Sequence, residues 1–194
     1  MVNAVAGAGF MPLEHYADCE RVYLGIENIH AVRTSYFKIF QYMLEGLPLR
    51  SAKQEAGWTK HYAAVMEGVR IIVEHVNLGT ATLVHCSDGW DRTAQLVSLA
   101  QLCLDPYTRT IDGFLAVLQR EWIAAGHQFE SRLARSLCIN TLKLPGKGAA
   151  GKGLAHVLET LSRSGEDGAK HRPEDEFCPV FPQFLDCVLQ FLRV

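Results

Sequence analysis

Apolar residues recur at helical spacing in several stretches of this 194-residue chain. Intervals of three or four residues between apolar positions are typical of an amphipathic helix, because 3.6 residues complete one turn. The spacing predicts helices over residues 35–44, 58–76, 93–103, 110–125 and 181–192. Gly79 and Gly126 follow two of these stretches and are expected to end the helices.

Two shorter apolar runs, residues 21–26 and 82–85, lack the helical spacing and predict strands. Helices that alternate with a few strands favour an α/β fold, so we expect a central sheet flanked by helices. Residues 1–18 are rich in Gly and Ala and predict a loop. Residues 133–176 alternate glycine with charge over much of their length and predict a flexible surface insertion, with a short helix at 155–161.

Composition narrows the class of protein. The hydrophobic fraction of 48% is that of a globular domain, and no apolar run reaches the roughly 18 residues that span a bilayer. The net charge of −2 gives no general attraction to nucleic acid, so none is expected as a partner. The six cysteines are scattered, which disfavours both a disulfide framework and a metal site and suits the reducing cytosol.

The clearest chemical signal is a cysteine, Cys86, separated from Arg92 by five residues. An expected strand precedes them and an expected helix follows, so the intervening loop lies at a helix N-terminus. Unpaired N–H groups and the helix dipole bind anions there, and the same field lowers the pKa of a cysteine. The guanidinium of Arg92 fits phosphate oxygens. Although such a spacing also arises by chance, the loop predicts a phosphatase with a phosphocysteine intermediate.

The polar residues of this loop support that chemistry. Gly89 suits a loop that cradles phosphate, and Ser87 and Thr93 can hydrogen-bond the thiolate or orient Arg92. Asp88 and Asp91 are unexpected, because two carboxylates should repel phosphate. We expect one of them to be protonated and to donate a proton to the leaving alkoxide, while the other is structural.

The string from Val84 to Thr93 resembles the active-site signature of the myotubularin family of phosphoinositide phosphatases. Five further blocks resemble family segments in the family's order: residues 3–6, 27–33, 104–114, 121–129 and 179–188. The resemblance implies a cysteine-phosphatase-like sheet. It implies that residues 1–194 form part of a phosphatase domain, truncated at both ends, whose relatives usually carry a lipid-binding domain of pleckstrin-homology type.

By resemblance, the substrates are phosphatidylinositol 3-phosphate and phosphatidylinositol 3,5-bisphosphate. Cys86 is then the nucleophile, Asp91 the general acid and Arg92 the residue that holds the phosphoryl group. We expect no metal and no cofactor, because Arg92 and the loop dipoles supply the positive charge.

The resemblance also implies that residues other than Cys86 and Arg92 contact the inositol head group. The residues concerned are Asn28, Ile29, Ser87, Asp88, Gly89, Trp90 and Arg132. Asn28 could instead be a helix cap, and Trp90 an ordinary core aromatic. Gln128 stands where the family commonly has a basic residue, and Arg132 could serve in its place.

The expected setting is the cytoplasm, peripheral to endosomal or other intracellular membranes, with membrane contact through a further domain or a partner. Homo- or hetero-oligomers with other family members are a further expectation. Two alternative functions stay open. One is a protein tyrosine or dual-specificity phosphatase, which the loop would permit. The other is an inactive, truncated family member that binds phosphoinositide.

Overall fold

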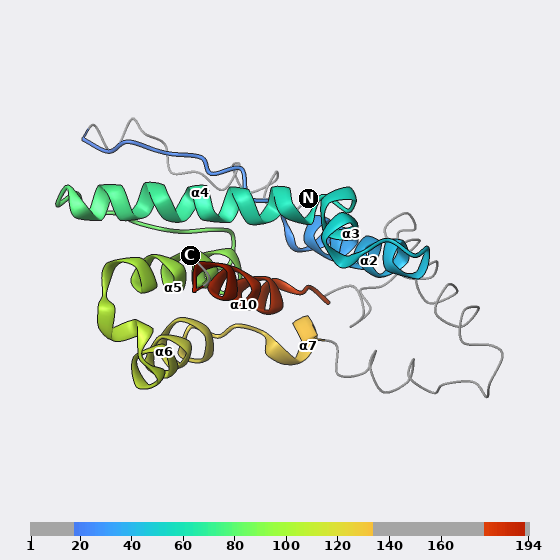
Figure 1. Cartoon of the computed structure of the whole chain (residues 1–194). Helices are drawn as coiled ribbons and strands as arrows, with labels where there is room; N and C mark the ends of the chain where they lie inside the picture. Colours follow the sequence, from blue (N-terminus) through green and yellow to red (C-terminus); the bar gives the residue numbers. More distant parts are fainter. Residues whose placement is uncertain (1–17, 134–176, 193–194) are drawn as a thin grey trace.

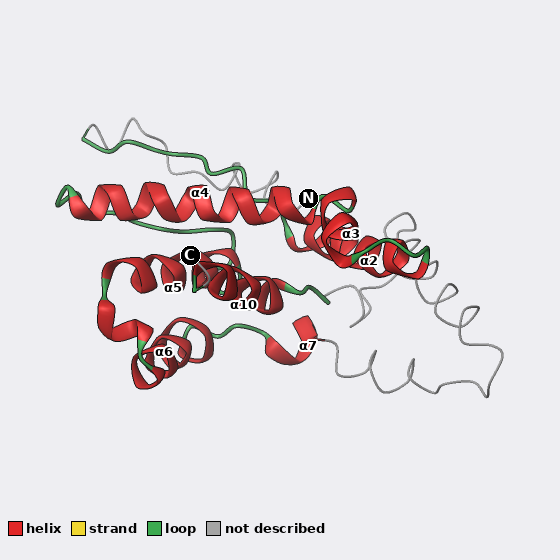
Figure 2. Cartoon of the chain, in the orientation of Figure 1, coloured by secondary structure: helices red, strands yellow, loops and turns green. Residues whose placement is uncertain are grey.

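The computed structural model describes residues 18–133 and 177–192, and their regular structure is helical (Figures 1 and 2). The elements in chain order are α2 (Ile29–Leu44), α3 (Leu49–Glu55), α4 (Trp58–Asn77), α5 (Arg92–Leu104), the 3-10 helix η2 (Pro106–Arg109), α6 (Ile111–Leu118), the π-helical segment η3 (Gln119–Ala124), α7 (Phe129–Leu133) and α10 (Val180–Phe191). All five predicted helices are therefore present.

The first helix, α2, begins six residues earlier than its apolar spacing predicts. The cause is Asn28, whose Oδ1 accepts hydrogen bonds from the N–H groups of His30 at 2.9 Å and Ala31 at 3.1 Å. Two of the N–H groups that a helix start leaves unpaired are thus satisfied. The short helix α3 was not predicted, because its seven residues bury only Ala52 and show no apolar periodicity.

The longest helix, α4, lies between two glycines with positive φ, Gly57 at 76° and Gly79 at 74°. Its 20 residues give a length of about 30 Å. The helix packs against α5 along its buried face (Figure 1). No helix in the described ranges is both long and apolar enough to cross a membrane.

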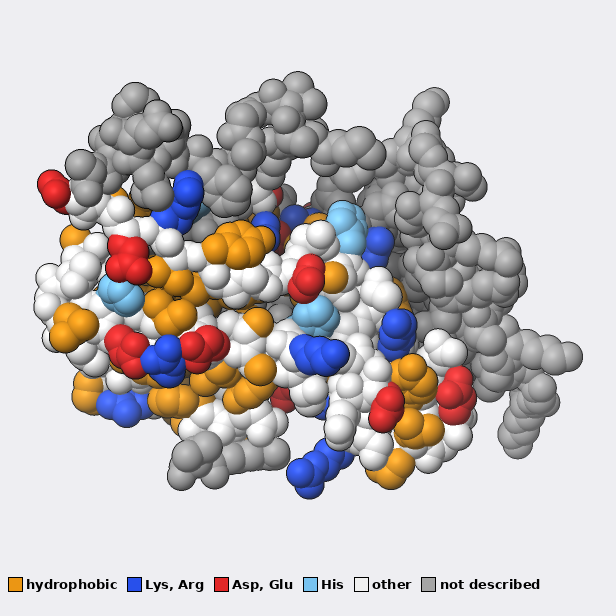
Figure 3. Space-filling view, turned by 90° about the horizontal axis from the view of Figure 1, so that it is seen from above, with side chains coloured by type: hydrophobic (Ala, Val, Ile, Leu, Met, Phe, Trp, Pro, Cys, Tyr) orange, Lys and Arg blue, Asp and Glu red, His pale blue; other side chains and the backbone are white. Residues whose placement is uncertain are grey.

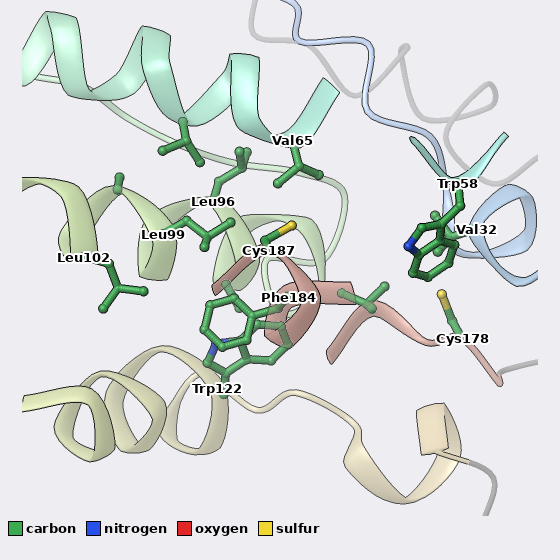
Figure 4. Close-up of a cluster of buried hydrophobic side chains, with 14 of the residues drawn as sticks. Val32, Trp58, Val65, Leu96, Leu99, Leu102, Trp122, Cys178, Phe184 and Cys187 are labelled. Carbon is green, nitrogen blue, oxygen red and sulfur yellow. The ribbon is translucent and has the colours of Figure 1, made fainter. Parts of the chain in front are cut away.

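The helix α5 lies at the centre of the fold, in contact with α4, α6 and α10. Leu96, Leu99 and Leu102 are buried (Figure 4). The polar side chains of Gln95 and Ser98 are buried as well. Because α5 is enclosed by α4, α6 and α10, the loop at its N-terminus is attached to a closely packed helix.

The predicted helix over 110–125 is present but changes its winding, since α6 continues directly into the π-helical segment η3. Trp122 in that segment is fully buried against Phe184 of α10, with ring centroids 4.9 Å apart (Figure 4). Its indole N–H donates to the Ser98 hydroxyl of α5 at 2.9 Å. This cluster ties η3 and α10 to the central helix.

The predicted α/β class is wrong for the part of the chain that the structure describes. Residues 18–133 and 177–192 contain no strand and therefore no central sheet. The predicted strands at 21–26 and 82–85 form irregular connections. Tyr23 and Leu83 are each 79% exposed, and residues 81–86 make no backbone hydrogen bond to another described segment. A short run with β-branched residues has only a local preference for the extended conformation. A strand forms only when a neighbouring strand supplies the partners for its backbone hydrogen bonds.

The remaining expectations about organisation fall outside the described residues. They are residues 1–17 of the predicted loop over 1–18, and residues 134–176 of the predicted insertion over 133–176 with its short helix at 155–161. Leu133, the first residue of that predicted insertion, ends α7.

Candidate active site

The loop between Cys86 and Arg92 is folded around the cysteine sulfur. The N–H of Gly89 donates to the Cys86 Sγ at 3.2 Å. Gly89 adopts a φ of 91°, which L side chains rarely adopt, and a Cβ there would meet nothing within 4 Å. The backbone conformation, rather than lack of space, therefore explains the glycine.

The surroundings of Cys86 favour its thiolate. Burial alone would raise the pKa of the thiol. The nearby Thr93 hydroxyl and the backbone N–H groups of Gly89, Thr93 and Asp88 favour the thiolate and outweigh burial, so the pKa of Cys86 is lowered. Three other cysteines contrast with it: burial raises the pKa of Cys103, and raises that of Cys178 and Cys187 to about 12.

Arg92, the first residue of α5, has its guanidinium held at two points. One Nη donates to the Ser87 hydroxyl at 3.0 Å, and the other lies 3.4 Å from the carbonyl oxygen of Ile26. The second contact brings the segment before α2 beside the loop. Asn28 and Ile29 therefore lie near the loop in the fold, but the side chain of Asn28 is occupied in capping α2.

The surroundings of Asp91 differ from those of Asp88, the other acidic residue of the loop. Its carboxylate is 7% exposed and pairs with Arg132, whose Nη2 lies 3.1 Å from Oδ2. The Nε of Arg132 lies 3.2 Å from Oδ1, so the contact is bidentate. The ring Nδ1 of His127, fully buried, is 3.1 Å from Oδ1. The carboxylate thus has donors on both oxygens.

The pKa of Asp91 follows from these contacts. Burial alone would raise it, but hydrogen bonds from His127 and Arg132 and the positive charge of Arg132 outweigh burial, and the pKa is lowered. The Nδ1 of His127 also lies 2.8 Å from the Trp90 carbonyl oxygen. Because both neighbours of this nitrogen are acceptors, Nδ1 carries the hydrogen and donates to both.

Asp88 and Trp90 complete the loop. Asp88 is exposed and makes no ion pair with any residue in the described ranges, whereas Trp90 is partly buried. His85 is exposed, and its Nδ1 lies 3.3 Å from the Cys86 carbonyl oxygen. Gln128 is exposed and donates to the Gly126 carbonyl oxygen at 2.8 Å.

The structure therefore brings Cys86, Ser87, Gly89 and Arg92 together and places Arg132 behind them, on Asp91. Sequence reasoning missed His127 as a partner of the loop. In the sequence, His127 follows Gly126 and lies between Trp122 and Phe129. This pattern predicts that the histidine is buried, but not that it contacts the loop from Cys86 to Arg92. Among the described residues, no three His, Cys, Asp or Glu side chains are grouped so as to hold a metal ion.

Comparison with known proteins shows which family this chain belongs to. Residues 1–194 match the family model of the myotubularin-like phosphatase domain. A phosphatidylinositol-3,5-bisphosphate 3-phosphatase of Caenorhabditis elegans is 33% identical over 196 residues, covering 100% of this chain and 25% of the relative. A phosphatidylinositol-3-phosphate phosphatase of Mus musculus is 41% identical over 141 residues, which cover 68% of this chain and 21% of the relative. Myotubularin of Xenopus tropicalis is 36% identical over 200 residues, which cover 99% of this chain and 28% of the relative. The chain thus spans about a quarter of the length of these relatives.

Proposed function

The chain belongs to the myotubularin family of phosphatase domains, and on this premise we propose that it is a phosphoinositide 3-phosphatase. Its substrates are phosphatidylinositol 3-phosphate and phosphatidylinositol 3,5-bisphosphate, the lipids that the names of its relatives specify. The observation that carries the proposal is the Cys86 sulfur, which accepts a hydrogen bond from the Gly89 N–H in the loop that ends at Arg92.

The reaction proceeds through a phosphocysteine. The Cys86 thiolate attacks the phosphorus, and the bond from phosphorus to the inositol oxygen breaks. Arg92 and the N–H groups of the loop hold the phosphoryl oxygens, whose charge grows in the transition state. Water then attacks the phosphocysteine, which releases inorganic phosphate and restores the thiolate. The chemistry needs no metal or cofactor.

The leaving inositol oxygen needs a proton, and the loop offers two carboxyl groups. The resemblance favours Asp91, and the carboxyl of Asp88 is the alternative. Their surroundings are opposite, since Asp91 is buried and paired with Arg132, whereas Asp88 is exposed. A group that gives up a proton must first hold it and then reach the leaving oxygen.

The surface charge of the chain bears on how it reaches a membrane. The net charge is −2, and positive and negative side chains are interspersed over the face seen in Figure 3. Each basic residue near an anionic bilayer adds only about 1 kcal/mol of attraction. We therefore propose a cytoplasmic protein that reaches endosomal or other membranes through a partner or a further domain. Association with other family members is one such route.

Trapping of the covalent intermediate tests the proposal. The chain would be mixed with short-chain phosphatidylinositol 3-phosphate, quenched in acid within a turnover and digested for mass spectrometry. We expect phosphate on the peptide that carries Cys86 and none in the Cys86→Ser variant. A wild-type chain that releases phosphate without this adduct would contradict the mechanism.

A further inference from the structure

Gly126 determines where His127 lies in the fold. It has a φ of 86° and follows the π-helical segment η3. The chain turns back there, so that the N–H of His127 donates to the Trp122 carbonyl oxygen at 2.9 Å. The carbonyl oxygen of His127 accepts from the Phe129 N–H at 2.9 Å. A glycine in the left-handed conformation commonly ends a helix in this way. Both backbone polar groups of His127 are therefore bonded within a few residues.

The side chain of His127 is held by aromatic neighbours. It is fully buried, and its ring packs edge-on against Trp122 and Phe129, with centroids 4.8 Å and 4.6 Å away. Trp122 is itself fixed, because its indole N–H donates to the Ser98 hydroxyl of α5 at 2.9 Å. The imidazole thus has little freedom to change the direction of its Nδ1–H group.

The hydrogen bonds of this ring go to the loop from Cys86 to Arg92. Nδ1 lies 2.8 Å from the Trp90 carbonyl oxygen and 3.1 Å from Oδ1 of Asp91, and it donates to both. The other ring nitrogen, Nε2, is buried and has no hydrogen-bond partner among the described residues. An unpaired buried nitrogen lowers stability, and an apolar side chain would fill the same space without that cost. Packing alone therefore does not account for a histidine here.

The contact to the Trp90 carbonyl oxygen sets the orientation of a loop peptide. The peptide bond between Trp90 and Asp91 is trans, so its carbonyl and its N–H point in opposite directions. Because the carbonyl oxygen points to the buried ring of His127, the N–H of Asp91 points away from that ring. A side chain 37 positions away thus sets the direction of an N–H group in the loop.

We propose that His127 is a positioning residue for the loop from Cys86 to Arg92. Its Nδ1–H holds the Trp90 carbonyl oxygen toward the buried cluster, so that the Asp91 N–H faces the phosphoryl oxygens. A carbonyl oxygen turned the other way would bring a partial negative charge against those oxygens. The bond from Nδ1 to the Asp91 carboxylate holds the next side chain on the same side of the loop. This inference rests on the proposed function, in which N–H groups of the loop bind phosphate.

Two variants of the 194-residue chain separate the hydrogen bond from the volume of the ring. Asn and Leu side chains have nearly the same shape. The amide nitrogen of Asn is bonded to Cγ, as Nδ1 is in histidine, so His127→Asn keeps a donor near the Trp90 carbonyl oxygen. His127→Leu fills the same space without a donor. Both lose the aromatic contacts of the ring, so a purely structural role predicts that activity falls with thermal stability in both.

Oxyanion affinity would be measured with tungstate, from its protection of Cys86 against iodoacetamide, and turnover with an aryl phosphate. A thermal melt records the stability of each variant. We expect His127→Leu to bind tungstate at least about tenfold more weakly than the wild type, the loss expected for one charge-assisted hydrogen bond, and to lose kcat/KM by at least as much. His127→Asn should stay within about threefold of the wild type in both, even if it melts no higher than His127→Leu.

The inference is overturned if His127→Leu keeps wild-type tungstate affinity, if both variants lose affinity equally, or if tungstate does not protect the wild type. Absence of phosphate release from any ester by the wild-type chain would instead overturn the proposed function, while the tungstate measurement still tests the role of His127.

If either variant does not fold, the ring ¹⁵N NMR signals of His127 in the wild-type chain replace the comparison. We then expect the hydrogen on Nδ1 and a change in the Nδ1 shift when tungstate binds. An anion on the Asp91 N–H polarises the peptide and strengthens the bond that its carbonyl oxygen accepts from Nδ1. A hydrogen on Nε2, or ring signals that do not respond to tungstate, would contradict the positioning role.

Discussion

The guanidinium of Arg92 donates to the hydroxyl of Ser87 at 3.0 Å, across the loop from Cys86 to Arg92. The contact closes the loop on itself, directly after Cys86 in the sequence. Arg92 is therefore oriented before any phosphate arrives, and the side chain loses less conformational freedom when it binds one.

Removal of the Ser87 hydroxyl should weaken substrate binding. In Ser87→Ala we expect the KM for an aryl phosphate to rise by roughly three- to tenfold, because one hydrogen bond to a charged group is lost, while Cys86 stays reactive. Ser51→Ala, at an exposed position of α3, is the control. A KM equal to that of the wild type would mean that the contact does not orient Arg92.

Alkylation should distinguish the cysteines. The pKa of Cys86 is lowered and that of Cys103 is raised, so the thiolate fraction at neutral pH is larger at Cys86. With limiting iodoacetamide at pH 7, peptide mapping should show Cys86 modified well before Cys103. Because both residues have intermediate exposure, access does not explain the difference. Equal rates would contradict the account of the loop.

The buried hydrogen bond between Trp122 and Ser98 should stabilise the fold. Ser98→Ala leaves the indole N–H without its partner and should lower the free energy of unfolding by about 1–3 kcal/mol, measured by urea denaturation. Ser51→Ala, at an exposed position of α3, is the control. The double variant Ser98→Ala/Trp122→Phe tests the cause. Because both residues form the same hydrogen bond, once Ser98→Ala has removed that bond, the further substitution Trp122→Phe should cost no second hydrogen bond.

Stability should fall in acid in part through Asp186. Burial alone would raise the pKa of its carboxyl, but hydrogen bonds from Lys53 and Trp58 and the Lys53 charge outweigh burial and lower it. A carboxyl whose pKa is lower in the folded state stabilises the fold above its unfolded pKa of about 3.9. That contribution is lost as pH falls through the lower, folded value.

Urea unfolding at pH 6, 4 and 3 would measure this contribution. The Asp186→Asn variant should lose less unfolding free energy than the wild type as the pH falls. Asp18→Asn, at an exposed aspartate outside the helices, should follow the wild type. If Asp186→Asn instead lost as much stability as the wild type, the carboxyl would contribute nothing to the pH dependence.

Helices could be predicted from this sequence because their apolar spacing is local. The start of α2 could not, because it depends on the capping bonds of Asn28 rather than on periodicity. The predicted strands failed for a different reason: a strand needs a partner, and residues 81–86 have none among the described segments.

The loop from Cys86 to Arg92 could be singled out from its spacing, because the two residues are close in sequence, and its catalytic role stays a prediction. The surroundings of Asp91 were not apparent. Arg132 lies 41 positions away, and its bond to Asp91 depends on how α7 is folded back onto the loop. A contact of that range is set by tertiary packing, which no short motif describes.

The central claim, that this chain removes the 3-phosphate from phosphoinositides through Cys86, is tested most directly by phosphate release from a panel of short-chain lipids. The panel includes phosphatidylinositol, its three monophosphates, its three bisphosphates and a phosphotyrosine peptide. We predict release from phosphatidylinositol 3-phosphate and phosphatidylinositol 3,5-bisphosphate, with none in the Cys86→Ser variant. Absence of release from every lipid, or release mainly from the peptide, would contradict the account.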